Sequence, residues 1–321
     1  MVTPRSEKGV ALIVVILMIS VIVALTLQWN RATRSEVYDA ANLRDGIRLF
    51  YVAQSGFYVA QALLADDRNN FDALNEDWAI AAKVNEKVAS LFGAGVLRVA
   101  IEDESGKIPV NKLLNGNTYN QSIREMLIRL LIQPEFGLEE KNAADIVDAL
   151  KDWMDKDEEP TGGGAETAYY AALAKPYTAK NAPLDCIEEL MMIKGITPEL
   201  YAGTESRPGL KDLLTVYGEG RININTAPLP VLRALSLGMT ADAAAQIDEY
   251  RKKIGEDLSS PDWYRKAAAG VDINPQLITV SSSHFKIIAT GVAGNMTRTV
   301  RGVVLRGRDK RTMKVLSWKA G

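Results

Sequence analysis

The hydrophobic pattern of the chain begins with one continuous apolar run. Residues 10–27 are apolar except for Ser20 and Thr26, and only nine residues precede them. A helix of that length, rising about 1.5 Å per residue, covers most of the roughly 30 Å hydrocarbon core of a bilayer. No small-residue cleavage motif follows the run, as it would in a secretory signal that is removed. The pattern therefore predicts a membrane-spanning helix.

Beyond the run, hydrophobic positions continue at helical spacing. Apolar side chains recur every three or four residues, at Leu43, Ile47, Phe50, Phe57, Ala60 and Leu64. Charged residues such as Arg44 and Arg48 lie between them, so the helix becomes amphipathic and must pack on a globular domain. We expect one helix over residues 10–64, roughly 80 Å long, which the polar residues 66–70 end.

Strand patterns are confined to two parts of the sequence. Residues 96–101 alternate as a strand, and residues 104–107 predict a turn into a short strand at 108–110. Strands return only near the end of the chain, at residues 285–290, 297–305 and 313–318. Between residues 120 and 262 the periodicity is mainly helical.

Strands separated by a helical block predict an α+β protein. A short strand pair is only marginally stable alone, so the simplest arrangement is one small antiparallel sheet with a helical domain inserted into it. We expect the long N-terminal helix to pack on this sheet. The predicted divisions are a leader at 1–9, a membrane and spine helix at 10–64, two parts of the sheet domain at 65–111 and 271–321, and an inserted helical domain at 112–270.

A weak internal repeat runs through the helical block. Residues 108–111 and 222–225 each end in asparagine, and each precedes two helical segments, the second beginning near 143–146 or 244–247. Each unit predicts a short strand, an asparagine turn and a helix pair. Two such pairs can bury each other's apolar faces, which is the usual basis of structural repeats.

Composition narrows the chemistry available to the protein. Its 321 residues include one cysteine, Cys186, and one histidine, His284, and the net charge is -2. A single cysteine cannot form an intrachain disulfide, so an exported fold must be held by core burial or by a metal. A single histidine argues against histidine-based catalysis and histidine-rich zinc sites. No nucleophile matches a known acyl-transfer motif, so we do not expect an enzyme.

The clearest candidate binding site is an acidic segment followed by glycines. Six carboxylates lie within residues 152–166, and residues 162–164 are glycines that precede the last carboxylate, Glu166. Ca²⁺ takes about six to eight oxygen ligands, and a glycine run lets backbone carbonyls converge. The spacing from Asp155 resembles an EF-hand loop, but Pro160 occupies the position that requires glycine, so we reject an EF-hand. The segment predicts either a calcium loop or a solvated acidic loop.

Two other segments resemble helix-hairpin-helix elements, which bind DNA phosphates through backbone N–H groups. They are residues 193–197 and 225–232. Acidic residues such as Glu188, Glu189 and Glu199 flank the first, which opposes phosphate binding. We therefore expect these turns to pack helices and expect no nucleic-acid partner. A membrane-anchored periplasmic DNA-binding protein is the alternative function, and a basic patch on the helical block would favour it.

The leader resembles that of a known family. Arg5, Lys8 and Gly9, followed at once by the apolar run, resemble the leader of type IV prepilins and type II secretion pseudopilins. The resemblance implies cleavage after Gly9 by a prepilin peptidase and methylation of the new amino terminus, Val10. These families almost always have glutamate at the fifth mature position, where it neutralises the amino terminus of a neighbouring subunit. Here that position is Val14. In lacking the glutamate, the chain resembles the minor pseudopilin K family of the type II secretion system.

The resemblance also implies a fold and a site. The fold is a pilin-like helix and sheet that carries an inserted helical domain. The sequence Asp-Trp-x-Asp-x-Asp from Asp152, followed by Gly-Ala-Glu, Tyr170 and Asn181, resembles the calcium-binding region of the family. The candidate ligands of a structural Ca²⁺ are Asp152, Asp155, Asp157, Glu159, Glu166 and Asn181.

For function, the resemblance implies a subunit that caps the periplasmic pseudopilus tip and supports export of folded proteins across the outer membrane. Its implied partners are other minor pseudopilins, the major pseudopilin filament, the prepilin peptidase and secreted proteins. The implied location is the inner membrane, crossed once, with the globular part in the periplasm.

Overall fold

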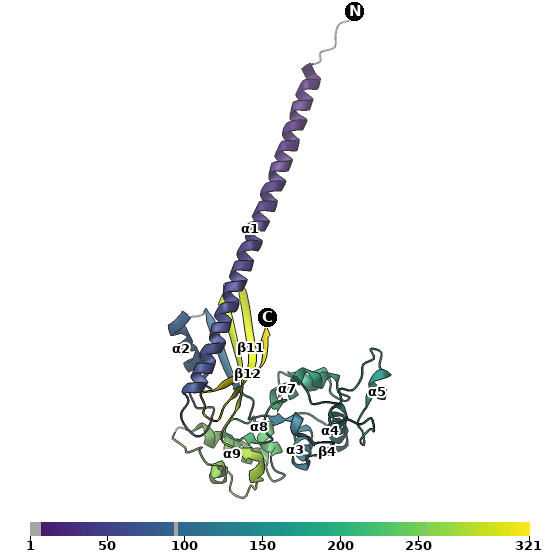
Figure 1. Cartoon of the computed structure of the whole chain (residues 1–321), viewed down its shortest axis with the longest axis vertical. Coiled ribbons are helices and arrows are strands. Elements are labelled where there is room, and N and C mark those ends of the chain that lie inside the picture. The colour runs from purple at the N-terminus through teal and green to yellow at the C-terminus, as the bar shows by residue number, and fades with distance from the viewer. Residues whose placement is uncertain (1–7, 93–95, 254) are drawn as a thin grey trace, which may run out of the picture.

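The longest element of the chain is a single helix that carries the apolar run. The computed structural model describes residues 8–92, 96–253 and 255–321. Helix α1, Lys8–Asp66, has 59 residues, and its first part projects alone from the rest of the molecule (Figure 1). Its most apolar window has a mean hydropathy of 3.2 and no buried residue, so this helix is long and apolar enough to cross a membrane. The predicted helix is confirmed, and the leader before Lys8 lies outside the described residues.

The second half of α1 packs on a four-stranded antiparallel sheet in the order β1-β10-β11-β12. The strands are β1 Leu97–Asp103, β10 His284–Ala293, β11 Met296–Arg306 and β12 Met313–Ala320. Ala53, Phe57 and Leu64 of α1 are fully buried in the core that the helix and the sheet share. The first strand and the last three are distant in the sequence but form one sheet, which confirms the predicted α+β class.

Small residues allow α1 to approach the sheet closely. A Cβ at Gly291 in β10 would lie 2.6 Å from the carbonyl oxygen of Leu49, and one at Gly56 in α1 would lie 2.8 Å from both methyl carbons of Leu97. Both distances are shorter than van der Waals contact. A side chain at Gly291 therefore requires the helix to move, and one at Gly56 requires the Leu97 side chain or the helix to move.

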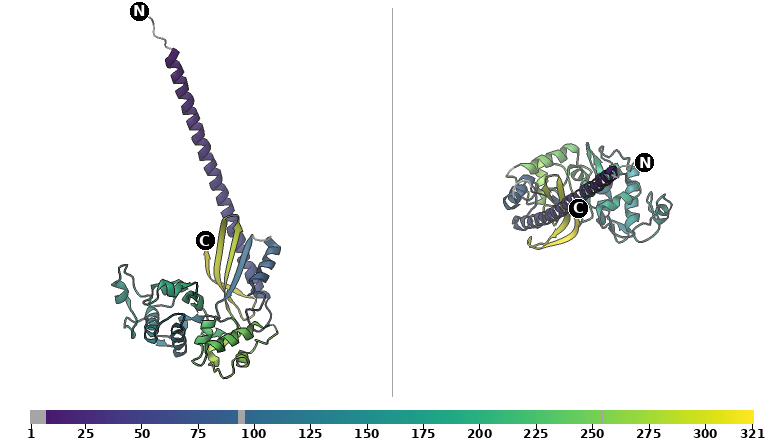
Figure 2. Two further views of the ribbon diagram at one scale, coloured as in Figure 1. Left: turned by 180° about the vertical axis from the view of Figure 1, so that it is seen from behind. Right: turned by 90° about the horizontal axis from the view of Figure 1, so that it is seen from above.

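Helix α2, Ala81–Phe92, covers β1 and lies outside the elements that the sequence predicts. Between β1 and β10 the chain then forms a mainly helical unit, the insert (Figure 2). The insert has its own hydrophobic core. Its longer helices are α3 Gln121–Leu131, α4 Glu140–Met154 and α9 Ala241–Lys252. Its short helices are α5 Thr167–Ala171, α6 Pro198–Ala202, α7 Leu210–Leu213, α8 Leu229–Ala234 and α10 Tyr264–Ala267, with 3-10 turns at Val110–Lys112, Ile187–Met192, Pro261–Trp263 and Pro275–Leu277. Its two-residue strands are β2 Ile108–Pro109, β3 Leu114–Asn115, β4 Thr118–Tyr119, β5 Gly203–Thr204, β6 Arg207–Pro208, β7 Leu214–Thr215, β8 Ile222–Asn223 and β9 Ile278–Thr279.

The packing places the ends of the insert slightly outside the predicted range of 112–270. Ile108 and Val110, before that range, are fully buried in the core of the insert. Ile278 and Val280, after it, are buried in the same core. The short strand predicted at 108–110 therefore belongs to the insert and not to the sheet.

The insert contains the predicted repeat. Strand β2 pairs in parallel with β7 and precedes α3 and α4, while β8 pairs in parallel with β9 and precedes α8 and α9. After β2, Nδ2 of Asn111 donates to the carbonyl of Val216, which follows β7, at 2.9 Å. After β8, Nδ2 of Asn225 donates to the carbonyl of Val280, which follows β9, at 3.4 Å. The two asparagines therefore close equivalent turns.

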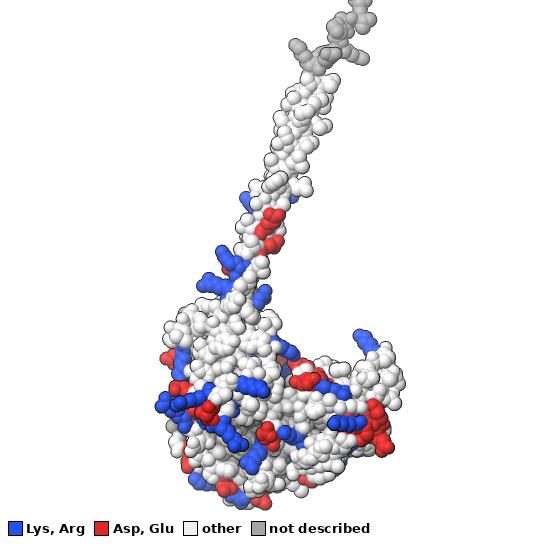
Figure 3. Space-filling view, in the orientation of Figure 1, with Lys and Arg blue, Asp and Glu red and all other residues white. Residues whose placement is uncertain are grey.

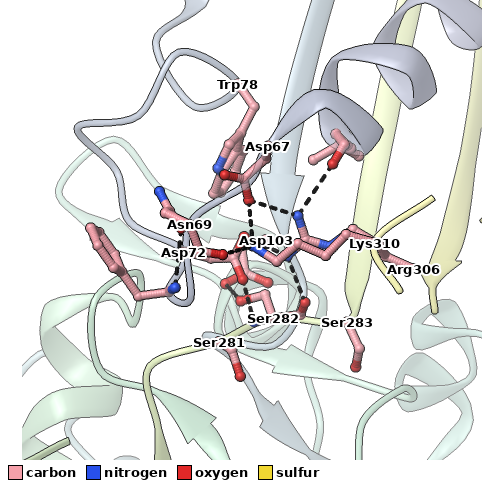
Figure 4. A network of polar contacts seen from close by, with 12 residues as sticks. Asp67, Asn69, Asp72, Trp78, Asp103, Ser281, Ser282, Ser283, Arg306 and Lys310 are labelled. Carbon is pink, nitrogen blue, oxygen red and sulfur yellow. Dashed lines mark hydrogen bonds and ion pairs between the residues drawn. The ribbon is translucent and has the colours of Figure 1, made fainter. Parts of the chain in front are cut away.

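A buried ion-pair network joins the insert to the sheet and to the end of α1 (Figure 4). Arg306, the last residue of β11, pairs with Asp67 at 3.0 Å and with Asp72, and donates to the carbonyl of Ser282 at 2.9 Å. The backbone N–H of Ser282 donates to Asp72 at 2.7 Å. Asn223 of β8 donates to the carbonyl of Asp72 at 3.0 Å. These bonds fix the insert relative to the sheet.

Candidate metal centre

Helix α4 presents carboxylates toward the loop that follows it. Its apolar residues, including Ile146, Val147 and Leu150, are buried in the core of the insert. Carboxylates recur at intervals of three, four and three residues, at Asp145, Asp148, Asp152 and Asp155. Helical spacing places such residues along one side. The glycine run 162–164 lies against that side, because a Cβ at any of these glycines would overlap one of the carboxylates. Glycine is therefore required for this approach.

Three carboxylates converge at the C-terminal end of α4. Asp152, Asp155 and Glu166 each place an oxygen within 4.8 Å of the others. Their exposed fractions are 0%, 1% and 2%. Burying ionised groups without partners is costly, so this group needs compensating positive charge.

Several oxygens around this group lack a hydrogen-bond donor. They are Oδ1 of Asp155, both carboxylate oxygens of Glu166 and Oδ1 of Asn181. Over the described ranges of the chain, the only other buried side-chain oxygens without a donor are one on Gln133 and one on Glu135. Buried polar atoms without partners are rare, and a concentration of them indicates a missing ion or water. Carboxylate and amide oxygens are ligands that Ca²⁺ takes, so these residues fit that ion.

Burial controls the protonation of this group. Burial raises the pKa of Glu166 to about 8, with a smaller contribution from the nearby carboxylates of Asp152 and Asp155. Burial also raises the pKa of Asp152. Without a cation, Glu166 in the folded site is therefore mainly protonated at neutral pH. A bound divalent cation would favour the ionised forms of both carboxyl groups.

Two lysines contact this site and its loop. Nζ of Lys151 contacts the carboxylate of Asp155. Nζ of Lys194, which belongs to the predicted hairpin at 193–197, donates to the carbonyls of Gly163 at 2.9 Å and Gly164 at 3.0 Å. Lys194 therefore anchors the glycine run, and its ammonium is engaged within the insert.

The structure brings together only some of the predicted ligands. Oδ2 of Asp157 accepts a hydrogen bond from Asn117 at 3.1 Å, and its Oδ1 accepts one from the backbone N–H of Glu159 at 3.1 Å. Glu159 itself is exposed. Neither joins the three buried carboxylates, so this geometry does not support them as ligands. Asn181 lies beside the group, because its backbone N–H donates to the carbonyl of Trp153 at 2.9 Å.

Three carboxylates near the site were not among the predicted ligands. Asp145 and Asp148 lie against the glycine run, and the hydroxyl of Tyr119 donates to Asp148 at 2.6 Å. Glu158 accepts a hydrogen bond from Nδ2 of Asn181 at 2.9 Å. The signal that could have found Asp145 and Asp148 is their helical spacing from Asp152.

A second group of carboxylates already has partners. It consists of Asp67 and Asp72, which belong to the network of Figure 4, and Glu76, and these three place oxygens within 4.8 Å of one another. Arg306 pairs with both aspartates, and Lys310 pairs with Asp67 at 2.8 Å. Glu76 accepts hydrogen bonds from the backbone N–H of Ala73 and the indole of Trp78. Because these carboxylates already have cationic or hydrogen-bonding partners, the group does not fit a metal ion.

The surface of the insert does not gather basic side chains on the face in view. Figure 3 shows Lys and Arg interspersed with Asp and Glu there, and acidic side chains gather on the side that carries α4 and α5. The ammonium of Lys194 is engaged by the glycine run. These observations oppose the alternative of a DNA-binding protein, which requires a basic surface.

A long helix with an exposed apolar first half and a small antiparallel sheet packed on its second half defines a pilin-like subunit with an anchor helix. Comparison with known proteins identifies its family. Residues 106–206 and 222–281, together half of the chain, match two family profiles that are both described as type II secretion system protein K. The chain belongs to the type II secretion system protein K family.

Individual relatives match over nearly the whole chain. Type II secretion system protein K of Pseudomonas aeruginosa is 27% identical over 95% of this chain and 90% of its own length. The protein of the same description from Aeromonas hydrophila is 24% identical over 99% of this chain and 98% of its own. A chain in the crystal structure of the GspK-GspI-GspJ complex from enterotoxigenic Escherichia coli has a TM-score of 0.68 at 18% identity, over 88% of this chain and 99% of that chain. The structural match confirms the predicted fold, and the sequence matches make the protein a component of type II secretion.

Proposed function

We propose that this protein is a minor pseudopilin that caps the periplasmic tip of the type II pseudopilus and supports export of folded proteins across the outer membrane. The observation that carries the proposal is the position of the insert, at the end of α1 remote from the apolar run (Figures 1 and 2). In a filament of parallel spine helices, the next subunit along the axis would need that volume. A subunit of this shape suits the end of a filament rather than its shaft.

The anchor part of α1 supports the same position. Residues 10–29 contain no charged side chain, and Val14 occupies the position where related subunits carry glutamate. A carboxylate in the membrane is costly unless it is paired. A tip subunit has no neighbour above it whose amino terminus needs this partner. The anchor would lie in the inner membrane, with the globular part in the periplasm and no catalytic role.

A substitution at Val14 tests the tip position. Val14→Glu is expected to leave secretion unchanged or mildly reduced, because the new carboxylate gains no partner at the tip. Val15→Glu, which places the same charge one residue further along, is the matched control. Secretion of a reporter enzyme and immunolabelling of pseudopili provide the measurements. Improved secretion by Val14→Glu, or label along the filament shaft, would contradict the proposal.

The structurally similar complex suggests the partners. It contains GspI and GspJ, and we propose that their counterparts join this protein at the tip, above the major pseudopilin filament. Tagged full-length protein, solubilised from membranes in detergent, is expected to recover both counterparts. The same purification from cells that lack one counterpart is the control. Recovery of neither would exclude a tip complex of this composition.

We also propose that Asp152, Asp155 and Glu166, with Asn181, hold a structural Ca²⁺ ion. A ligand that binds only the folded state stabilises it by about 2.7 kcal/mol at a hundredfold excess over Kd. Chelator is therefore expected to lower the melting temperature of the full-length protein, and Mg²⁺, which prefers a rigid octahedral shell, should restore it poorly.

Two alanine variants make this test specific to the site. Asp155→Ala is expected to ignore added Ca²⁺ and to melt at or below the temperature of the chelated wild type, because it also loses the contact with Lys151. Asp157→Ala is the matched control and should keep the calcium response, because Asp157 lies outside the buried group. If chelator leaves the melting temperature of the wild type unchanged and elemental analysis finds no metal, the segment is a solvated acidic loop and not a calcium site.

A further inference from the structure

Lys151 places a positive charge inside the carboxylate group of the candidate metal centre. It lies on α4 one turn before Asp155, and its side chain is only 12% exposed. Its Nζ contacts Oδ2 of Asp155, lies 2.8 Å from Oγ1 of Thr161, and lies 3.9 Å from Oδ1 of Asp152. An ammonium that loses most of its hydration needs close anionic partners, and here those partners are two of the proposed metal ligands.

The ammonium uses one side of the carboxylate group and leaves the other side open. It contacts Oδ2 of Asp155, whereas Oδ1 of the same carboxylate and both oxygens of Glu166 have no donor. When all three carboxylates are ionised, as a bound cation would favour, one ammonium leaves two of their negative charges uncompensated. That is the charge that one divalent cation would neutralise.

We propose that Lys151 is a built-in counter-ion of this site, an inference that rests on the calcium site proposed above. Without metal, its ammonium holds Asp152 and Asp155 in their folded positions. Its charge also repels a cation bound to the same carboxylates, so Lys151 sets the Ca²⁺ concentration at which the site fills. Lys151 is a positioning residue and not a ligand, because an ammonium has no lone pair to offer a metal.

The two effects of Lys151 have opposite signs. An uncharged side chain at this position removes an attraction from the metal-free protein and a repulsion from the metal-loaded protein. Stability without metal should therefore fall while Ca²⁺ affinity rises. A lysine with a purely structural role would behave differently, since its loss would lower both quantities.

Lys151→Met tests the proposal, because methionine keeps an unbranched side chain without the charge. The full-length protein in detergent is expected to melt at a lower temperature than the wild type in chelator and at a similar temperature in saturating Ca²⁺. The Kd for Ca²⁺ by titration calorimetry is expected to fall roughly tenfold, the order of magnitude for removing one charge at this range in a partly screened site. If the metal-free variant does not fold, the rate of Ca²⁺ release from the loaded protein into chelator replaces the Kd, and it should slow by a similar factor.

Two further variants isolate the charge of Lys151. Lys151→Arg keeps the charge and should retain the wild-type melting temperature and Kd. Lys156→Met removes a nearby exposed lysine and should also change neither quantity. The counter-ion role would be overturned if Lys151→Met bound Ca²⁺ as weakly as the wild type or more weakly, or, where release is measured, if release did not slow. Either result would leave the calcium site intact. Failure of the wild type to bind Ca²⁺ would overturn the calcium site and the counter-ion together.

Discussion

Buried carboxylates in this protein differ in what compensates them. Asp72 is fully buried, but Arg306 pairs with it and the backbone N–H of Ser282 donates to it. Glu166 is also buried, and neither of its oxygens has a donor. The first carboxylate belongs to a closed structural network. The second is destabilising unless a cation reaches it.

Glu166→Gln is expected to separate the cost of burying this carboxylate from the stabilisation that a bound cation gives. In chelator at neutral pH, the variant should be more stable than the wild type by roughly 1–3 kcal/mol, because burial of the carboxyl group, whose pKa is about 8, is unfavourable there. The variant should also lose the stabilisation by Ca²⁺. Urea denaturation with and without Ca²⁺ measures both changes, and Glu159→Gln, at an exposed site, is the control. A variant less stable than the wild type in chelator would show that Glu166 is compensated without metal.

Asp103 lies where the insert joins the sheet, and its raised pKa predicts that the stability of the protein depends on pH. It accepts hydrogen bonds from the hydroxyls of Thr226 and Ser282, and burial raises its pKa to about 6. A carboxyl group whose folded pKa lies above the unfolded value of 3.8 contributes stability below pH 3.8 and loses it as the pH rises through 6. Asp103→Asn removes this titration.

The expected result is a difference between two denaturation curves. From pH 4 to pH 7, the free energy of unfolding of Asp103→Asn should rise relative to the wild type by up to about 3 kcal/mol. Taking the difference at each pH removes any constant cost of the amide, and chelator throughout keeps the metal site out of the measurement. A difference that does not vary with pH would contradict the assigned pKa.

At the scale of elements, the repeated asparagine turns organise the insert. Nδ2 of Asn111 donates to the carbonyls of Leu184 and Val216, and its Oδ1 accepts from the backbone N–H of Leu184. Nδ2 of Asn225 also donates to two carbonyls, and its Oδ1 accepts from the indole of Trp263 at 2.7 Å. One side chain in each repeat therefore ties a strand to two distant loops.

Loss of either asparagine should destabilise the insert. Asn111→Ala and Asn225→Ala each leave buried backbone carbonyls without donors, at an expected cost of about 2–4 kcal/mol. Thermal denaturation of the full-length protein in saturating Ca²⁺ measures the loss. Asn117→Ala removes an exposed asparagine and should cost less than about 0.5 kcal/mol. Similar stabilities for all three variants would remove the structural role of the turns.

Strongly periodic elements could be predicted from the sequence, whereas elements defined by their neighbours could not. Helix α1, strands β10 and β11 and helices α3 and α4 have many buried positions at regular spacing, and each was predicted. Helix α2 buries only Val84 and Val88 among its 12 residues. Its role depends on contact with β1, and a hydrophobic pattern carries no information about that contact.

The acidic segment shows the same limit at the site. Its carboxylate content and its glycines predicted a binding loop, but the ligands depend on where the helix ends. Asp155 leaves α4 in an extended conformation with ψ 178°. Beyond that residue the helical spacing no longer applies, so Asp157 and Glu159 turn away while Glu166 returns to Asp152. A sequence does not specify the direction of such a turn.

At the scale of the whole molecule, α1 carries both the predicted processing site and the contact with the sheet. Gly9 and Val10 lie in its first turns. Gly9→Leu should block cleavage, because a bulky side chain obstructs the peptidase, and leave a chain longer by its nine leader residues. Mass spectrometry of the membrane-extracted protein measures the amino terminus, with Gly9→Ala as the small-residue control. A wild-type amino terminus other than Val10 would contradict the predicted site.

The two connections of the insert determine how it would carry a mechanical load. The chain leaves the sheet after Asp103 and returns at His284, and these points are adjacent, because Asp103 pairs with Phe285 and the N–H of Glu104 donates to the carbonyl of His284 at 3.0 Å. A force on the insert directed along the strands reaches β1 and β10 at the same end and in the same direction. Such a force does not shear one strand past the other. Thrust along the spine would therefore pass into the insert through both strands at once, without peeling the sheet apart.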